Sequence, residues 1–146
     1  MRTVPASRRV PHFAKAALER SLSGRGIAYT HMPELGGLRK PKPDSINVGW
    51  RNVSFRGYAD YMQTEEFWAA IDRLQALAGE QRLAIMCAEA VPWRCHRSLI
   101  ADALTVRGVE VRHITAKSEA ARHSLTPFAR VADGRITYPP TDTLAL

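Results

Sequence analysis

The sequence predicts an α/β protein: a Rossmann-like three-layer sandwich with a mainly parallel central sheet and a C-terminal β-hairpin. Apolar runs of strand length alternate with stretches whose apolar residues recur at helical spacing. Strands separated by helices imply parallel pairing through crossover helices. Residues 128–138 place Asp133-Gly134 between two strand-like stretches, which is typical of a hairpin. The length of 146 residues fits one domain, so we expect a single α/β domain over residues 1–146.

The first half of the chain contains one expected helix, one expected strand and a long loop. Apolar residues at helical spacing predict a helix over residues 11–23, which the glycines that follow would end. Residues 27–31 then have the character of a short strand. Residues 33–50 are rich in proline and glycine, so we expect a loop. We interpret Tyr58 and Tyr61 as packing residues of the long loop, and base stacking is the alternative.

The second half alternates more regularly. A helix is expected over residues 64–79, with Thr64 as its N-cap and acidic residues in its first turn. The apolar run 82–87 predicts a strand that is buried on both faces. Residues 96–107 predict an amphipathic helix, and residues 109–114 alternate as the next strand.

The charge of the chain favours anionic partners. The formal net charge is +7, and arginine supplies most of the excess. Guanidinium groups bind phosphate and carboxylate groups in a forked geometry, so an anionic small molecule or nucleic acid is a candidate partner. The alternative is an arginine-rich genome, in which arginine is encoded at positions where lysine would serve equally well. The sequence leaves a homo-oligomer open.

The cellular setting follows from what the sequence contains. No apolar run approaches the roughly 18 to 20 residues of a membrane span, and the N-terminal stretch does not have the pattern of a secretory signal. Two cysteines are too few for a disulfide scaffold, so we expect a reduced, cytoplasmic protein without a membrane partner. No motif indicates a cofactor.

The segment 83–97 carries the strongest sign of chemistry, because both cysteines lie in it, eight positions apart. Cys95 comes at or next to the start of the helix expected after it. There the helix dipole favours the thiolate, so Cys95 is a candidate nucleophile with His96 assisting. The alternative is a small cysteine that merely packs. Cys87 ends the expected strand, and burial in the sheet explains it as well as chemistry does.

The other polar residues of this segment also allow two interpretations. Glu89 could act as a general base or bind a substrate hydroxyl. Alternatively, it could be a solvated loop acid or the partner of Arg94 or Arg97. Arg97 could hold an anion beside the helix N-terminus, or it could form a surface salt bridge. Cys87, Cys95, His96 and His113 are numerous enough for zinc. We expect no metal, because adjacent residues 95 and 96 would point apart on a helix.

The pattern M-C-A-E-x-x-P-x-x-C-H-R-x-L-I-A-x-x-L, followed by G-V-x-V-x-H-I, resembles a bacterial family called domain of unknown function 488 (DUF488). The resemblance continues in Gly26–Gly37, as Gly-Ile-x-Tyr-x-His-x-Pro-x-Leu-Gly-Gly. It also includes Phe55–Met62 and the stretch Gly134–Pro139. The family implies a Rossmann-like fold and supplies no known reaction.

The resemblance also implies a short N-terminus and a set of ligand-binding residues. The family begins with a strand, a helix and a second strand ending in Asp-Val-Arg, of which this chain retains the final arginine, so we expect an N-terminally truncated domain. The matching polar and glycine residues would gather at the carboxyl edge of the sheet. They are Arg2, Ser7, Tyr29, His31, Gly36, Gly37 and Arg97. Tyr29 and His31 could equally fill the core, and Gly36-Gly37 could be a simple turn.

Three functional hypotheses follow. The first is an enzyme that binds an anionic ligand, nucleotide or phosphate-bearing, at the carboxyl edge of the sheet. Its catalytic residues would come from Cys95, His96, Glu89 and Cys87. The second is a non-catalytic nucleic-acid-binding module that uses Trp50, Arg51 and Arg56. The third is an inactive fragment.

Overall fold

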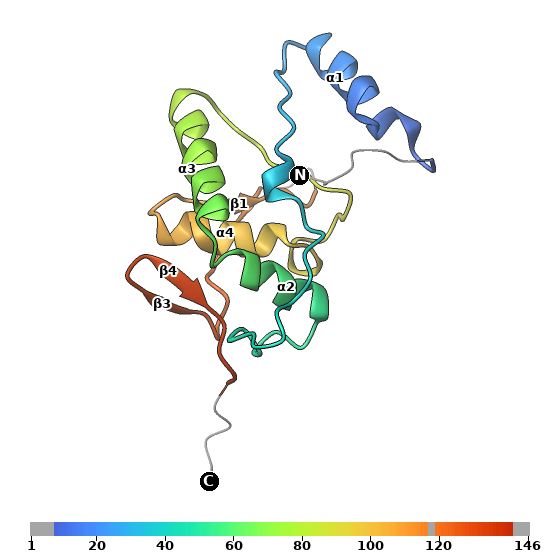
Figure 1. Ribbon diagram of the computed structural model, residues 1–146. Helices are drawn as coiled ribbons and strands as arrows, with labels where there is room; N and C mark the ends of the chain where they lie inside the picture. The colour runs from blue at the N-terminus through green and yellow to red at the C-terminus, as the bar shows by residue number, and fades with distance from the viewer. Residues whose placement is uncertain (1–7, 117–118, 142–146) are drawn as a thin grey trace.

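The fold is built around helix α4, Arg97–Val106, as Figure 1 shows in a computed structural model that describes residues 8–116 and 119–141. Seven consecutive residues of α4, from Ser98 to Leu104, are buried. A helix that is apolar around most of its circumference can be covered on several sides at once. Helix α3, Glu65–Glu80, the strand β4, Arg135–Thr137, and the 3₁₀ turn Pro92–Arg94 all contact α4.

Helix α3 matches the expectation for its segment closely. The hydroxyl of Thr64 accepts a hydrogen bond from the backbone N–H of Phe67, which caps the first turn. Phe67, Ile71 and Leu74 recur at helical spacing and are buried against the core. Helix α4 is likewise confirmed, and Gly108 follows it with a φ of 79°, the left-handed conformation common after a helix end.

Helix α2, Val53–Tyr61, replaces part of the long loop expected there. Asn52 caps it by accepting hydrogen bonds from the backbone N–H groups of Ser54 and Phe55. Tyr58 and Tyr61 do pack into the core, but from a helix. A capping asparagine followed by apolar residues at positions 55, 58, 59 and 62 was a sequence signal for this helix.

The first expected helix is split. A 3₁₀ turn, Pro11–Phe13, precedes helix α1, Lys15–Ser23. None of the residues of α1 is buried. Figure 1 shows α1 held away from α2, α3 and α4 at the end of an extended connection. That connection leads to another 3₁₀ turn, Pro33–Leu35, which packs against α3.

The predicted Rossmann-like sandwich is wrong. Within the described residues, the strands form two antiparallel pairs and no parallel central sheet. Residues 27–31 and 82–87, both expected as strands, are extended connections without a strand ladder. A strand exists only with a hydrogen-bonded partner, and an apolar or alternating pattern does not supply one. Of residues 109–114, only Arg112–His113 form a strand.

The strands are short. Strand β1, Arg112–His113, pairs antiparallel with β2, Ala121–Arg122. Strand β3, Arg130–Ala132, pairs with β4 across the expected hairpin, which is confirmed. Asp133 and Gly134 have φ values of 49° and 71°, so both central residues of the two-residue turn are left-handed. This is the geometry that an Asp-Gly turn favours.

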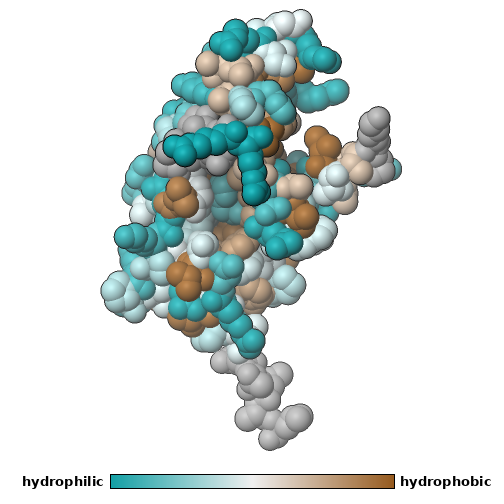
Figure 2. Space-filling model, turned by 90° about the vertical axis from the view of Figure 1, so that its right-hand side faces the viewer, coloured by the Kyte–Doolittle hydropathy of each residue, from teal (hydrophilic) through white to brown (hydrophobic). Residues whose placement is uncertain are grey.

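The core lies where α2, α3, α4 and β4 meet. Its largest fully buried apolar side chains include Tyr58, Phe67, Leu99, Ile136 and Tyr138. Figure 2 shows apolar side chains reaching the surface among hydrophilic ones on one face of the molecule. No helix among the described residues is both long enough and apolar enough to cross a membrane.

Candidate active site

Cys87, Cys95 and His96 form one cluster, which we call the thiol site. Their two sulfur atoms and one imidazole nitrogen all lie within 4.8 Å of one another. Both cysteines are free thiols. The 3₁₀ turn Pro92–Arg94 folds the chain back so that positions 87 and 95 meet, and the backbone of Cys95 is extended, with φ −134° and ψ 144°.

Adjacent Cys95 and His96 therefore do not point apart, as we expected from a helical placement. Both precede the first residue of α4, and His96 occupies its N-cap position. Cys95 Sγ lies 3.6 Å from His96 Nδ1. The exclusion of metal rested on that helical placement, and the three clustered residues could offer two thiolates and one imidazole to an ion such as zinc. His113 lies elsewhere, on β1.

The orientation of His96 is fixed from the opposite side of its ring. Its Nε2 lies 3.1 Å from the carbonyl oxygen of Leu35. A carbonyl can only accept, so Nε2 carries the proton, and Nδ1 of the neutral ring presents a lone pair toward Cys95. Burial is the largest cause that lowers the pKa of His96, which favours this neutral form.

Gly37 and Tyr58 enclose the same ring. A Cβ atom on Gly37 would lie 2.5 Å from His96 Nδ1, so only glycine allows the backbone to approach this closely. The ring of Tyr58 lies 5.0 Å from the imidazole, centroid to centroid, and its hydroxyl donates to the carbonyl of Leu35. The structure thus brings the predicted residue Gly37 to the site. Its neighbour Gly36 is buried at the end of the turn Pro33–Leu35.

The two thiols differ in environment. Cys95 is 4% exposed, whereas Cys87 is half-buried. A hydrogen bond from Cys95, supported by the backbone N–H groups of Glu89 and Ala88, lowers the pKa of Cys87 to about 5. The same hydrogen bond, together with burial, raises the pKa of Cys95. These shifts favour the thiolate form of Cys87 and the thiol form of Cys95.

Arg97 connects the two halves of the loop. Its Nε donates to Cys95 Sγ over 3.3 Å, and its terminal NH2 donates to the carbonyl oxygen of Glu89. The Glu89 side chain is exposed and accepts from the backbone N–H of Val91 instead of reaching the thiols. Glu89 is thus placed as a solvated acid of the loop, as one of its two interpretations expected.

The remaining predicted ligand-binding residues are not gathered at the thiol site. Tyr29 and His31 lie in the connection between α1 and the turn Pro33–Leu35, and both are half-buried. Among the described residues, Tyr29 takes part in no side-chain hydrogen bond or ring contact. Arg2 and Ser7 lie outside the described residues.

Trp50, which the nucleic-acid-binding hypothesis uses, packs against other aromatic side chains. The ring of Trp50 stacks on Phe55 at 4.8 Å and meets Phe128 edge-on at 4.9 Å. Its carbonyl accepts from Arg56 Nε, whereas Arg51 is exposed. Base stacking on a free Trp50 face gains no support from this geometry, and nucleic-acid binding stays a prediction.

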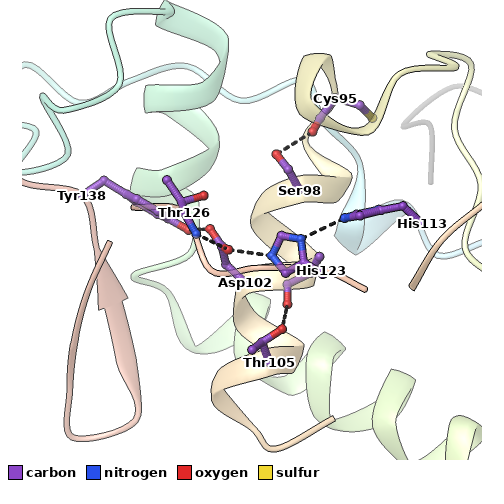
Figure 3. Close-up of polar contacts among 9 residues, drawn as sticks. Cys95, Ser98, Asp102, Thr105, His113, His123, Thr126 and Tyr138 are labelled. Carbon is purple, nitrogen blue, oxygen red and sulfur yellow. Dashed lines mark hydrogen bonds and ion pairs between the residues drawn. The ribbon is translucent and has the colours of Figure 1, made fainter. Parts of the chain in front are cut away.

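Sequence reasoning missed a second polar cluster, centred on Asp102 in the middle of α4. Its fully buried carboxylate accepts hydrogen bonds from His123 Nε2, from the backbone N–H of Thr126 and from the hydroxyl of Tyr138. The signal was an acidic residue inside an otherwise apolar stretch of the helix, since a buried charge is stable only with partners. Figure 3 shows these partners converging on α4 from the C-terminal part of the chain.

The fold and the site define a small, mainly helical protein with a paired-thiol and imidazole cluster. The family described as domain of unknown function DUF488 matches residues 1–104, and the chain belongs to it. The family assignment made from the central motif is thus confirmed. No curated protein and no solved structure matches the chain.

Proposed function

We propose that this protein is a thiol-dependent enzyme for an anionic substrate, with Cys87 as the nucleophile. The observation that carries the proposal is the placement of two free thiols and one imidazole within 4.8 Å of one another. The half-buried Cys87 is the more exposed of the two thiols, and its lowered pKa favours the thiolate. A thiolate that is also accessible is the reactive form of cysteine.

The residues around the pair can support one round of group transfer. Cys87 Sγ bonds to the electrophilic atom of the substrate, and the bond from that atom to the leaving group breaks. The leaving group keeps the electron pair and takes the proton of the Cys95 thiol. Arg97 Nε, 3.3 Å from Cys95 Sγ, then stabilises the new thiolate.

The second half returns the enzyme to its starting state. Water attacks the atom bound to Cys87, the bond to sulfur breaks, and Cys87 leaves as the thiolate. The proton released by the water returns to Cys95, directly or through His96 Nδ1, which lies 3.6 Å from this sulfur. The net reaction is hydrolysis of the substrate, with no oxidant or reductant consumed.

The anionic character of the substrate is inferred from charge. Arg97 donates to Cys95 Sγ, and Arg94 lies in the 3₁₀ turn between the two cysteines. The carboxylate of Glu89, in the same loop, accepts from the backbone N–H of Val91. The chain carries a formal net charge of +7. Arginines near a half-buried nucleophile would attract and orient a phosphate or carboxylate group.

Alkylation by iodoacetamide as a function of pH tests the nucleophile. With mass spectrometry resolving the two cysteines, Cys87 should react with a pH midpoint of about 5, and Cys95 should react slowly. Cys95→Ala should move the Cys87 midpoint toward the ordinary value of about 8.5, while Ser54→Ala on α2 should not. An unchanged midpoint in Cys95→Ala, or a midpoint near 8 in the unmodified chain, would contradict the proposal. So would one tightly bound zinc ion per purified chain.

A pair of disulfide reagents tests the preference for anions. The dianionic 5,5′-dithiobis(2-nitrobenzoate) should react faster with Cys87 than the neutral 2,2′-dithiodipyridine does, and its advantage should shrink as salt rises. Arg94→Gln should reduce the rate with the anionic reagent by about threefold and leave the neutral reagent unaffected, since the loss of one nearby charge changes an exposed interaction by up to about 1 kcal/mol. If Arg94→Gln lowers the reaction rates with both reagents equally, the proposed preference for an anionic substrate is contradicted.

A further inference from the structure

A hollow of about 260 Å³ is lined in part by Arg97, whose Nε also donates to Cys95 Sγ of the thiol site. Its walls come from the end of α3, from residues 81–85, from α4 and from residues 109–114. Residues 82–85 and 109–114, which line it from two sides, belong to segments that were both expected as strands. Because they do not pair, apolar side chains that a sheet would have covered line an open space. Leu74, Ile85, Leu104, Val109 and Val111 are among them.

The rim of the hollow is basic. Arg82, Arg97 and Arg112 contribute three guanidinium groups, against the single carboxylate of Glu110. Glu110 is already paired with Arg112, at 2.7 Å. Arg82 has no ion pair or side-chain hydrogen bond among the described residues, so its charge is available to a ligand. An apolar interior with a cationic rim is complementary to a molecule that has an apolar body and one acidic group.

His113 adds a directional polar group to the wall. Its Nε2 lies 2.8 Å from His123 Nδ1, and His123 Nε2 lies 2.8 Å from the carboxylate of Asp102. Figure 3 shows this row of rings leading from His113 to Asp102. The carboxylate accepts, so His123 carries a proton on Nε2, and a singly protonated His123 accepts from His113 through Nδ1.

The consequence for His113 is a defined tautomer. Its Nε2 holds the proton that His123 accepts, which leaves Nδ1 as an acceptor for a ligand. Burial, followed by the neighbouring His123 and Arg97, lowers the pKa of His113, while Asp102 opposes that shift. The neutral acceptor form is therefore favoured at neutral pH.

We propose that this hollow binds a small molecule with an apolar, aromatic-sized body, one acidic group and one hydrogen-bond donor. Arg82 and Arg97 bind the acidic group, the apolar walls enclose the body, and His113 accepts from the donor. Arg97 also contacts Cys95 Sγ, so a ligand in the hollow lies next to the thiol site. The interpretation of this ligand as the substrate rests on the proposed function, whereas the binding site does not.

Two fluorescent probes test the site. 8-Anilinonaphthalene-1-sulfonate has an aromatic body, a sulfonate and an N–H donor, and N-phenyl-1-naphthylamine has the same body without the sulfonate. The unmodified chain should bind the sulfonate probe saturably with one site, about tenfold more tightly than the neutral probe, as expected for a charge-assisted contact. Equal affinities would overturn the assignment of an acidic ligand.

Matched variants locate the probe. Arg82→Gln should weaken the sulfonate probe by about fivefold, and the exposed Arg51→Gln should not, because Arg51 lies outside the hollow. Ala78→Trp places a large ring at the wall and should abolish binding of both probes. Ala76→Trp, on the same helix but away from the hollow, should leave binding unchanged. If the two tryptophan variants behave alike, the probes bind elsewhere and the proposal fails.

The site and the proposed enzyme can fail separately. The double variant Cys87→Ser, Cys95→Ser removes the thiol chemistry and should retain the affinity for the sulfonate probe. His113→Phe keeps a ring at the wall and removes the acceptor, so it should weaken the sulfonate probe by about threefold. If probe binding is retained and both thiols have ordinary pKa values, the ligand site is supported and the proposed enzyme is contradicted. If Cys87 is reactive and no saturable probe binding is found, the proposed enzyme is supported and the ligand site is contradicted.

Discussion

Helices α1 and α4 have similar length and similar amphipathic spacing, yet they stand in opposite relations to the rest of the molecule. Helix α4 has ten residues, seven of them buried, whereas α1 has nine residues and none is buried. Figure 1 shows α4 surrounded by other elements and α1 at the periphery. Helical spacing predicts that a helix forms, and it says little about how much of that helix is covered. Most helical stability comes from such covering.

The largest test of this contrast truncates one leucine in each helix. Leu99→Ala removes a fully buried side chain of α4 and should cost about 2–5 kcal/mol of unfolding free energy, because it leaves a cavity. Leu18→Ala in α1 should change it by less than about 0.5 kcal/mol, since no packed neighbour is lost from the core. Urea unfolding followed by tryptophan fluorescence measures both. Comparable losses would show that α1 is part of the cooperative core.

A second pair neutralises one acidic residue in each helix. Asp102→Asn replaces an acceptor of three hydrogen bonds with an amide that cannot accept them all. We expect a loss of about 1–3 kcal/mol for each stranded donor. Glu19→Gln, exposed on α1, should have no measurable effect. Urea unfolding measures both variants. An unchanged unfolding free energy in Asp102→Asn would show that the Asp102 carboxylate is dispensable for folding.

A third pair adds a methyl group near each helix. In Gly37→Ala the new Cβ would overlap the imidazole of His96, which packs just before α4, at a cost of about 1–3 kcal/mol. In Gly24→Ala, at the end of α1, the nearest atom is an ordinary contact at 3.5 Å and φ is −62°, so alanine should be tolerated. Thermal unfolding monitored by circular dichroism compares them. A neutral Gly37→Ala would indicate that His96 can move away without loss.

The smallest effects concern caps. Thr64→Ala removes the cap of α3, which packs on α4, and should cost about 1 kcal/mol. Helix α1 has Ala14 at its N-cap with no side-chain hydrogen bond. Ala14→Ser should slow amide exchange within α1 and leave the global unfolding free energy within about 0.5 kcal/mol. Hydrogen exchange followed by mass spectrometry separates the local from the global effect. If Ala14→Ser instead raised the global unfolding free energy by about 1 kcal/mol, as a full N-cap does, α1 would unfold together with the core.

The thiol site shows how far the sequence could lead. The clustering of both cysteines, a histidine and an arginine within a few positions pointed to the right segment. It did not reveal that the two thiols meet, because this depends on the 3₁₀ turn that brings Cys87 and Cys95 together. The contact of Gly37 with His96 joins segments far apart in the chain, and only the folded chain could show it.

The expected sheet failed for a related reason. Residues 82–87 have the apolar character of a buried strand, and residues 109–114 alternate as a strand does. Their partners are not encoded in either pattern, and in the structure the two segments face each other across a hollow. The hairpin at Asp133-Gly134 succeeded because its pairing is local and its turn residues select the geometry.

The sequence by itself determined the features that depend on neighbouring residues: the cores of the helices, the caps at Thr64 and Gly108, the Asp-Gly hairpin and the family motif. These are decided by local backbone preferences and short-range hydrogen bonds. The tertiary structure alone decided which segments stayed unpaired, how the two cysteines meet, and which glycine packs on His96. Each of these depends on the free energy of contacts between distant parts of the chain, where burial and desolvation outweigh any local preference.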